Sequence, residues 1–335
     1  MISRRLFAQG FAGVLAAGTL AACSSDTAAA PAASAAGHTT FPSLKQIQAG
    51  PLDVGYAEAG PADGQPVFLL HGWPYDIHAY VDVAPILAAA GYRVIVPFLR
   101  GYGATTFLYP DTVRNGQQAA TASDLIALMD ALHVDKAVLA GYDWGGRTAT
   151  CVAAIWPERV KAATLVSGYL INNLAANRAP LAPAAERGWW YQFYFATDRG
   201  VAGYTHNRHD FNKLIWTQAS PDWKFTDDTY NRSAKAFDNP DHVAVVIHNY
   251  RWRLGLADGE QQYAEVEQKL QASPVITVPT ITVGSDFDGA AIDGKGYRDK
   301  FTGKYEHRVF KGIGHNVPQE TPQDFAKAVM DADRL

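Results

Sequence analysis

The sequence predicts an α/β fold, in which a mostly parallel sheet is flanked by helices and a helical cap is inserted late in the chain. Two observations lead to this prediction. Between residues 44 and 166, short apolar runs of strand length alternate with stretches of helical periodicity. From about residue 169 to 259 the strand patterns fade and aromatic residues crowd together, and strand patterns resume near residue 278. Alternating strands and helices place helices on both faces of a parallel sheet.

The expected elements follow in chain order. Residues 44–48 and 54–58 should form a leading hairpin, and further strands are expected at residues 67–70, 93–97, 136–140, 160–166, 278–283 and 306–310. Apolar side chains recur on one face over residues 120–132, which indicates a helix, and a final helix is expected near residues 323–331.

This order divides the chain into a core and a cap. The core should comprise residues 41–168 and 260–335, and the helical cap residues 169–259. Ligands bind at the carboxyl ends of the strands in open α/β sheets. We therefore expect the aromatic face of the cap to cover those strand ends and to enclose a binding site there.

The N-terminus has the features of an export signal. Residues 1–22 begin with a charged stretch that contains Arg4 and Arg5 and resembles a twin-arginine signal, and an apolar stretch follows. The Leu-Ala-Ala-Cys motif that ends at Cys23 resembles a bacterial lipobox, which implies cleavage before Cys23 and lipidation of its thiol. Residues 23–40 are small and polar and should form a flexible tether to a membrane. The alternative is an export signal in which the cysteine is incidental. We expect a membrane-anchored lipoprotein, periplasmic or on the cell surface.

Composition excludes several classes of function. The formal charge is −4 and no basic cluster follows the first residues, so nucleic acid is not an expected partner. The chain has 2 cysteines, too few for a cysteine-based zinc site. Cys151 lies in an apolar helical stretch and should be a core residue. His206 and His209 could share a helix face, but no acidic pattern accompanies them and we expect no metal and no cofactor.

A glycine-rich turn at residues 141–146 carries the candidate nucleophile. Gly141 and Gly145 flank the central Asp143 between an expected strand and an expected helix, which is the pattern of a nucleophile elbow. The glycines are needed because this turn leaves no room for Cβ atoms beside its strained central residue. The alternative is an ordinary glycine-rich turn.

An aspartate at this position indicates the class of reaction. A carboxylate that attacks an ester would give an unstable anhydride, whereas its attack on a saturated carbon gives an alkyl ester that water can split. The substrate should therefore carry its leaving group on saturated carbon, as an epoxide or an alkyl halide does. The same reasoning argues against a serine-type esterase.

Hydrolysis of an alkyl ester requires a base and donors for the oxyanion. His315 follows the last expected strand and is the candidate base. A histidine base needs an acidic partner, and Asp286 and Asp288 both follow the strand at residues 278–283. The backbone N–H groups of Trp73 and Trp144 are the expected oxyanion donors.

Together these motifs resemble those of epoxide hydrolases of the α/β-hydrolase fold family. The His-Gly-Trp-Pro motif at residues 71–74 and the Gly-Tyr-Asp-Trp-Gly-Gly motif at residues 141–146 are similar to that family's motifs, and the resemblance covers residues 45–332. It implies that Asp288 is the acid that orients His315, because the family carries this acid nine residues after the proline. Tyr142 stands where the family commonly has histidine, and Ser285 where it often has glycine.

The resemblance also assigns two tyrosines in the cap. Tyr191 and Tyr250 lie in segments similar to those that carry the family's ring-opening tyrosines. An opening epoxide develops an alkoxide, and two phenols can donate to it. The alternative is that these tyrosines only pack within an aromatic cap. The implied substrate is a small apolar epoxide, and water is the second reactant.

Two other functions compete with epoxide hydrolysis. A haloalkane dehalogenase would use the same nucleophile, base and acid, and the indole N–H of Trp144 could hold a halide. Against it, Trp73 stands where many dehalogenases have Asn or Glu. A binding lipoprotein that has lost turnover is the other possibility, although every assigned group is present. Four tryptophans indicate an apolar pocket, namely Trp73, Trp144, Trp189 and Trp190, while the oligomeric state is left open by the sequence.

Overall fold

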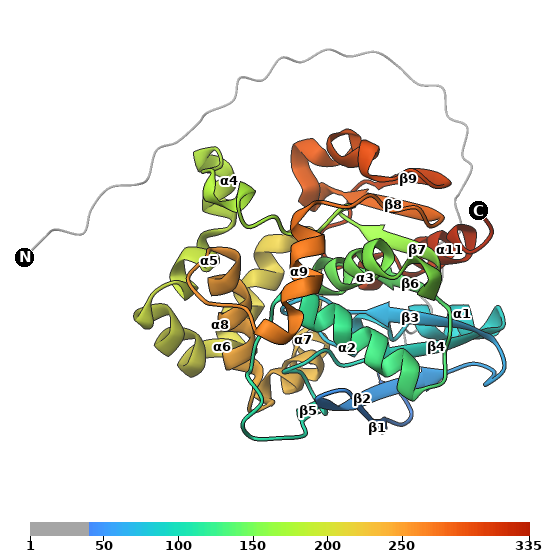
Figure 1. Ribbon diagram of the computed structural model, residues 1–335, viewed down its shortest axis with the longest axis horizontal. Coiled ribbons are helices and arrows are strands. Elements are labelled where there is room, and N and C mark those ends of the chain that lie inside the picture. Colours follow the sequence, from blue (N-terminus) through green and yellow to red (C-terminus); the bar gives the residue numbers. More distant parts are fainter. Residues whose placement is uncertain (1–39) are drawn as a thin grey trace, which may run out of the picture. The chain divides into compact units, whose positions relative to one another are not determined.

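The computed structural model describes residues 40–335, and its centre is a 9-stranded mixed sheet (Figure 1). The strands follow the order β1-β2-β4-β3-β6-β7-β8-β9, with β5 paired to β2. Their bounds are β1 (Lys45–Ala49), β2 (Leu52–Ala59), β3 (Gln65–Leu70), β4 (Tyr92–Pro97), β5 (Thr106–Phe107), β6 (Ala137–Gly141), β7 (Val160–Val166), β8 (Thr280–Ser285) and β9 (Tyr305–Phe310). Residues 1–39, which include the expected export signal and Cys23, lie outside the described residues.

The pairing of the strands brings the chemically important loops together. Strands β4, β3, β6, β7, β8 and β9 run parallel to one another, whereas β2 pairs antiparallel with β1, β4 and β5. In the register of β3 with β6, Leu70 lies opposite Gly141. The loop after β3 and the turn after β6 therefore leave the same edge of the sheet next to each other.

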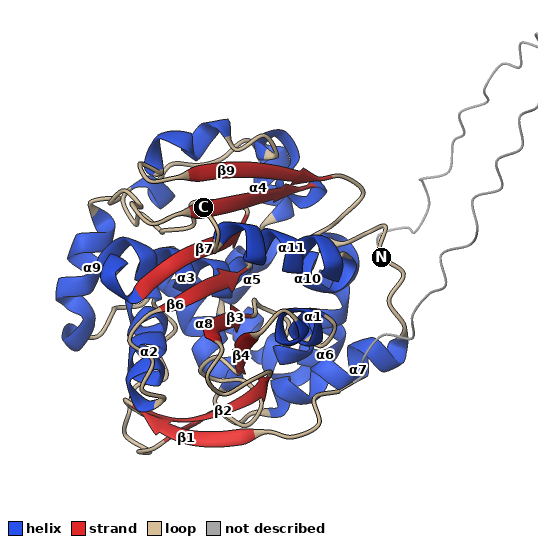
Figure 2. Ribbon diagram, turned by 90° about the vertical axis from the view of Figure 1, so that its right-hand side faces the viewer, coloured by secondary structure: helices blue, strands red, loops and turns tan. Residues whose placement is uncertain are grey.

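Helices cover both faces of this sheet (Figure 2). One face packs against α1 (Val83–Ala89) and α11 (Pro322–Ala332), and the short α10 (Val317–Glu320) leads into α11. The other face packs against α2 (Gln118–Ala131) and α3 (Asp143–Ile155), on which α9 (Ala264–Gln271) lies.

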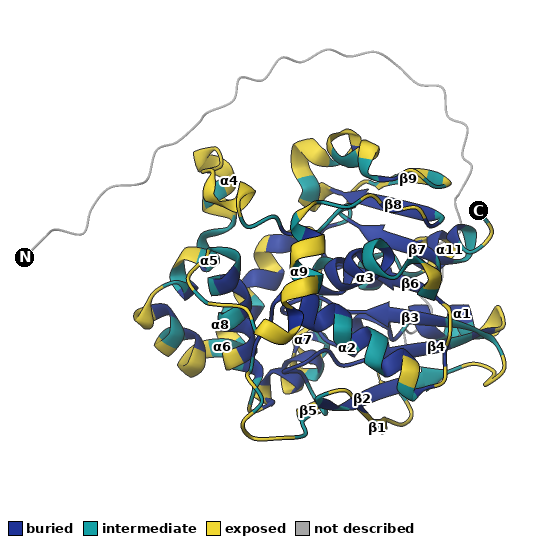
Figure 3. Ribbon diagram, viewed as in Figure 1, coloured by how far each residue is buried: buried dark blue, intermediate teal, exposed yellow. Residues whose placement is uncertain are grey.

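The central strands are buried on both faces, as expected for a parallel sheet between two helical layers (Figure 3). Along β3, Val67 and Leu69 belong to one hydrophobic cluster and Phe68 and Leu70 to the other, because successive side chains point to opposite faces. Continuous apolar runs were the sequence signal for these strands, and the double burial explains that signal.

Between β7 and β8 the described chain is helical. Its main helices are α4 (Pro183–Gly188), α5 (Trp190–Phe195), α6 (Asp198–Ala219), α7 (Asp227–Ala234) and α8 (His242–Arg253). Their aromatic side chains pack on one another and on Trp73 of the core, for example Phe195 and Phe211. The ribbon shows this group of helices at one end of the sheet (Figure 1).

The sequence predicted an α/β-hydrolase fold with a mostly parallel sheet, and the structure confirms it. The expected strands and the two expected helices all occur, with ends within about two residues of their predicted positions. Strand β5 was missed, because two residues at a sheet edge carry no periodic pattern. Among residues 40–335, every helix is too short or too polar to cross a bilayer.

Candidate active site

Asp143 occupies a strained turn between β6 and α3. Its backbone has φ = 50°, a left-handed conformation that non-glycine residues rarely adopt. A Cβ atom on Gly145 would lie 1.9 Å from the carbonyl oxygen of Leu70, and one on Gly141 would lie 2.5 Å from the backbone of Gly145. Glycine is therefore required at both flanking positions, and the turn raises Asp143 above the carboxyl edge of the sheet.

The two carboxylate oxygens of Asp143 have different surroundings. Oδ1 accepts a hydrogen bond of 2.7 Å from the backbone N–H of Trp73, and the backbone N–H of Trp144 also donates to the carboxylate. Oδ2 lies 3.6 Å from Nε2 of His315. Oδ1 is thus held by the backbone N–H of Trp73, while Oδ2 faces the imidazole.

These contacts keep Asp143 ionised. Burial alone raises the pKa of its carboxyl group, but the hydrogen bond and charge of His315 and the two backbone N–H donors outweigh burial, so that the net pKa is lower than usual. A carboxylate nucleophile must carry its charge to attack, and this site favours the charged form.

His315 is buried, with a side-chain exposure of 7%. Its Nε2 faces Asp143, whereas Nδ1 has no hydrogen-bond partner among the described residues. The ring of Phe287 lies against the imidazole, with 4.1 Å between ring centroids. Nucleophile and expected base are therefore brought together from positions 172 residues apart in the sequence.

Neither expected acid bonds to the imidazole. Both lie in the 3₁₀ helix η6 (Asp286–Ala291) that follows β8. Oδ2 of Asp288 accepts a hydrogen bond of 2.8 Å from the backbone N–H of Ser285, and Oδ2 of Asp286 accepts one of 2.8 Å from that of Gly312. Both carboxylates thus stabilise the loops beside His315, and the choice of Asp288 as its orienting acid stays a prediction.

The two expected tyrosines meet beside the nucleophile. Tyr191 on α5 and Tyr250 on α8 are both buried, and their ring centroids lie 5.3 Å apart. Burial raises the pKa of Tyr191 well above its ordinary value, as does the charge of Asp143, whereas a hydrogen bond with Tyr250 lowers it. Burial, Tyr191 and Asp143 likewise raise the pKa of Tyr250. Both phenols consequently stay protonated and can act as donors at any pH near neutrality.

The side chain of Trp73 forms part of the same cluster. Its ring lies 4.9 Å from that of Tyr191 and 5.1 Å from that of Tyr250, and its indole N–H donates a 3.0 Å hydrogen bond to the hydroxyl of Tyr204. Trp144 also contacts Tyr250, with 6.0 Å between centroids, but its indole N–H is buried without a partner among the described residues. The indole N–H of Trp73 is therefore already used in a hydrogen bond, whereas that of Trp144 is not.

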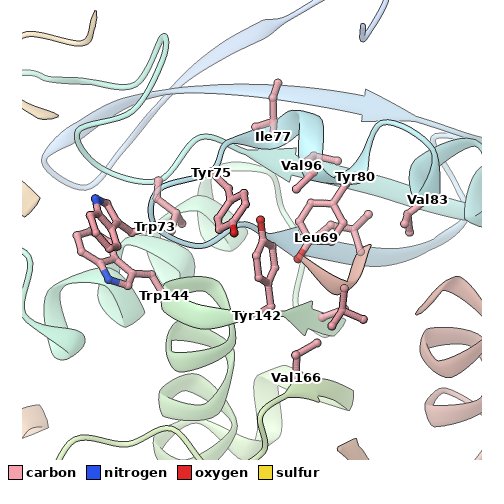
Figure 4. Packing of buried hydrophobic residues seen from close by; sticks show 14 of the residues in the cluster. Leu69, Trp73, Tyr75, Ile77, Tyr80, Val83, Val96, Tyr142, Trp144 and Val166 are labelled. Carbon is pink, nitrogen blue, oxygen red and sulfur yellow. The ribbon is translucent and has the colours of Figure 1, made fainter. Parts of the chain in front are cut away.

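Tyr142 and Tyr75 lie next to each other in the buried cluster that also contains Trp73 and Trp144 (Figure 4). Their ring centroids lie 5.4 Å apart, and each ring lies 5.8 Å from the imidazole of His315. Tyr142 is fully buried, so the residue that departs from the family's histidine packs under the site and does not reach the cavity.

His71 supports the oxyanion loop. Its Nε2 accepts a hydrogen bond from the backbone N–H of Leu99, which leaves Nδ1–H to donate to the carbonyl of Gly72. Burial lowers the pKa of His71 to about 4, although the Gly72 carbonyl and nearby carboxylates oppose that shift. The neutral imidazole of His71 uses both ring nitrogens in hydrogen bonds. It therefore positions the loop and has no free nitrogen for catalysis.

A cavity of about 600 Å³ opens onto these groups. Asp143 and His315 lie on its wall together with mainly apolar side chains, namely Trp73, Trp190, Tyr191, Ile215, Phe287 and Ile313. Polar side chains also line it, namely Arg187, Gln218, Asp222 and Asp286. Of the four tryptophans expected in the pocket, Trp73 and Trp190 line this cavity, whereas Trp144 and Trp189 do not. Trp144 is buried against Tyr250, and Trp189 lines a separate cavity.

The sequence did not single out Ile215, Phe287 or Ile313 as pocket residues. Ile215 belongs to the buried stripe of α6, and Phe287 lies between the two candidate acids. Their apolar character beside functional residues was a usable signal, but which way a loop side chain points depends on packing that the sequence pattern does not contain.

Comparison with known proteins agrees with this geometry. The family model for the alpha/beta hydrolase fold matches residues 65–317. A crystal structure of a "putative epoxide hydrolase" from Klebsiella pneumoniae has 60% sequence identity and a TM-score of 0.86, and the match covers 88% of this chain and 98% of that one.

Curated relatives include both enzyme types that the sequence suggests. An epoxide hydrolase from Caballeronia sordidicola is 39% identical over 104 residues, which is 31% of this chain and 30% of that protein. A haloalkane dehalogenase from Mycobacterium marinum is 30% identical over 207 residues, which is 60% of this chain and 67% of that protein. The matched segment thus spans under a third of the Caballeronia protein and about two thirds of the Mycobacterium one. From the family model and the Klebsiella structure together, the chain belongs to the α/β-hydrolase fold family.

Proposed function

We propose that this hydrolase converts an epoxide into a vicinal diol through a covalent alkyl ester on Asp143. The observation that carries the proposal is the pair of buried phenols, Tyr191 and Tyr250, whose rings lie 5.3 Å apart and which both lie within the electrostatic influence of Asp143. Two such donors suit a developing alkoxide. A halide leaving group needs no proton transfer, because halides leave as stable anions.

In the first step, Oδ2 of Asp143 attacks a ring carbon of the epoxide. The carbon–oxygen bond breaks, its electron pair moves to the ring oxygen, and a proton from the Tyr191–Tyr250 pair neutralises that oxygen. Oδ1, which the backbone N–H of Trp73 holds at 2.7 Å, becomes the carbonyl oxygen of the ester. The different surroundings of the two oxygens suit this division of roles.

In the second step, His315 takes a proton from water, and the hydroxide attacks the ester carbon. Oδ1 gains negative charge and is stabilised by the same N–H donors of Trp73 and Trp144. Collapse of the intermediate releases the diol and restores the carboxylate, and the proton on His315 returns to the tyrosine pair. Asp288 is the proposed partner of the imidazolium in this step.

The cavity suits a small apolar epoxide. Its wall combines the rings of Trp73, Trp190 and Phe287 with the side chains of Ile215 and Ile313. Burial of an apolar substrate against this part of the wall is favourable, by about 25 cal/mol per Å² of apolar surface removed from water.

Haloalkane dehalogenase is the alternative, and one observation favours it. The indole N–H of Trp144 is buried without a partner among the described residues. A group that donates a hydrogen bond to a departing halide would be free in the same way. The indole N–H of Trp73 is not free in the same way, because it donates to Tyr204. Dehalogenase relatives such as the Mycobacterium marinum enzyme keep this alternative open.

Product analysis on matched substrates distinguishes the two functions. The purified enzyme is given styrene oxide and 1-bromo-2-phenylethane in parallel, with diol measured by chromatography and bromide by ion-selective electrode. We expect diol from the first substrate and at most a trace of bromide from the second. Bromide release faster than diol formation would reject the proposal in favour of dehalogenation.

We also propose that the enzyme is exported and anchored to a membrane through lipidated Cys23. The support is the lipobox-like motif at residues 20–23 and the small, polar composition of residues 24–40. Expression in a bacterial host should place the enzyme in the membrane fraction, and Cys23→Ser should release it with unchanged activity. A fully processed chain that stays in solution with an unmodified Cys23 would refute the anchor.

A further inference from the structure

The loop that carries His315 is fixed by an acidic residue downstream of it. The loop joins β9 to α10, and the carboxylate of Glu320 turns back onto its backbone. Oε2 accepts a 2.7 Å hydrogen bond from the N–H of Gly314, and Oε1 accepts a 3.0 Å bond from the N–H of Asn316. Glu320 therefore holds the residues on both sides of the base.

The remaining N–H, that of His315 itself, bonds to the cap. It donates at 2.9 Å to the hydroxyl of Ser220, which directly follows cap helix α6, and at 3.2 Å to the carbonyl of Ala219. The hydroxyl of Ser220 in turn donates to Oε1 of Glu320 at 2.6 Å. A Cβ atom on Gly314 would lie 2.5 Å from the Ser220 hydroxyl oxygen, so only glycine lets the loop approach this closely.

The same end of α6 also touches the oxyanion loop and the cavity. One helical turn before Ser220, the indole N–H of Trp216 donates a 2.7 Å hydrogen bond to the carbonyl of Pro74, next to Trp73. Ile215 and Ala219 line the cavity. The last turn of α6 and Ser220 are thus hydrogen-bonded to the loop of Trp73 and to the loop of His315. The same turn also lines the cavity in which the substrate would bind.

We propose that Ser220 and Glu320 form a positioning pair that ties the seating of cap helix α6 to the position of the His315 imidazole. The pair fixes three successive backbone N–H groups, those of Gly314, His315 and Asn316, and thereby aims Nε2 of His315 at Asp143. This role rests on the proposed function and deepens it. It predicts that the pair matters for hydrolysis of the ester and little for its formation, because His315 is needed only for hydrolysis.

The test separates the two half-reactions in single turnover. Wild type, Ser220→Ala and Glu320→Gln are each mixed, in excess, with a limiting amount of styrene oxide and quenched at intervals. The fraction of enzyme that carries one substrate mass is read by intact-protein mass spectrometry as it rises and then falls. Glu320→Gln keeps the shape of the side chain but can accept at only one of its two terminal atoms. We expect ester formation to change by less than about twofold and ester hydrolysis to slow by about ten- to a hundredfold, the range expected for a misplaced catalytic group.

Two control variants lose comparable groups elsewhere. Ser233→Ala removes a buried hydroxyl of cap helix α7 that has no hydrogen-bond partner among the described residues. Glu267→Gln alters a carboxylate that, like Glu320, accepts three hydrogen bonds, here from Gln117, Gln118 and Ala119. Both controls should keep wild-type rates in both half-reactions. Ser220→Thr retains the hydroxyl and should restore most of the hydrolysis rate.

Each outcome decides the proposal. Selective loss of ester hydrolysis in both variants, with recovery in Ser220→Thr, supports it. Equal loss of both half-reactions, or unchanged hydrolysis in the correctly folded Glu320→Gln enzyme, overturns it. If the wild-type enzyme itself forms no ester on Asp143, the proposed function has failed, and this result is distinct from a failure of the positioning pair.

Discussion

The phenol rings of Tyr191 and Tyr250 meet at an angle of 83°, with 5.3 Å between their centroids, although they come from different helices 59 positions apart. Both rings also pack on Trp73, whose backbone N–H holds the nucleophile. The cap thus brings two buried phenols close to Asp143 of the core, and the ring of Trp73 contacts both of them.

Removing one hydroxyl of this pair should slow ring opening. Tyr191→Phe or Tyr250→Phe should lower the rate of ester formation on the order of 10²-fold, since one donor to the developing alkoxide is lost, and the double variant should be slower still. Ester hydrolysis, once the ester exists, should change little. The measurement is single-turnover ester formation with an epoxide.

Tyr194 provides the control for this prediction. It lies on the same helix as Tyr191 and stacks on Phe211, away from the cavity. Tyr194→Phe should leave the rate unchanged. A double variant of Tyr191 and Tyr250 with wild-type epoxide turnover would remove the observation on which the proposed function rests.

Two buried histidines should make the fold sensitive to acid. Burial lowers the pKa of His71 to about 4 and that of His242 to about 3, against an ordinary value near 6.5. Both are neutral in the native state, with His242 bonded to the hydroxyl of Tyr204 and the carbonyl of Gly101. Below pH 6.5 the unfolded chain binds protons that the folded chain does not, so stability must fall as the pH falls.

The expected size of this effect is several kcal/mol. For His71 alone, a pKa lowered by about 2.5 units corresponds to about 3 kcal/mol, lost between pH 6.5 and pH 4. Urea unfolding at a series of pH values measures it. His242→Gln should flatten the dependence, whereas His206→Gln, at an exposed position, should not. A free energy of unfolding that stays constant from pH 7 to pH 4.5 would contradict the prediction.

The sheet and the proximity of Asp143 to His315 could be predicted from sequence because each has a local signature. Strands buried on both faces are continuous apolar runs, such as Val160–Val166, and their ends follow from the turns around them. The nucleophile elbow requires Gly141 and Gly145, so its motif records a steric condition. Parallel pairing then brings the turn of Asp143 to the same edge of the sheet as the loop of His315.

The cap and the loops could not be predicted to the same depth. A run of aromatic residues predicts a crowded helical layer but does not indicate which rings face the cavity, and Trp144 and Trp189 do not line it. The contacts of Ser220 with Glu320 join residues 100 positions apart through loop geometry alone. Such pairs depend on how the cap is seated on the core, which no short-range pattern records.

The identity of the orienting acid can be decided by amide substitution. Asp288→Asn should slow ester hydrolysis by on the order of 10²- to 10⁴-fold, because a histidine base without its carboxylate partner loses its preferred tautomer and the stabilisation of its charged form. Asp286→Asn should cost much less, since that carboxylate accepts from the backbone of Gly312. Single-turnover hydrolysis of the ester is the measurement.

Both amide variants also alter loop contacts, so their folding must be compared first. Asp288 accepts from Ser285 in the structure, and melting temperatures show whether that contact alone accounts for a loss. A large defect in Asp286→Asn with a normal Asp288→Asn would reverse the assignment. Wild-type hydrolysis in both variants would mean that neither carboxylate assists His315.

Replacement of His315 should separate the two half-reactions completely. Ester formation needs only the Asp143 carboxylate, an aligned epoxide and the tyrosine donors, whereas ester hydrolysis needs a base for water. The base lies 3.6 Å from Oδ2 of Asp143, and an amide in its place is far too weak to deprotonate water at pH 7. His315→Gln should therefore form the ester and fail to release it.

Intact-protein mass spectrometry should show the enzyme heavier by one substrate mass, with the adduct on the peptide that contains Asp143. Asp143→Asn should show no adduct, provided that its amide has not hydrolysed back to the acid. An adduct on another residue, or normal turnover by His315→Gln, would reject the two-step mechanism.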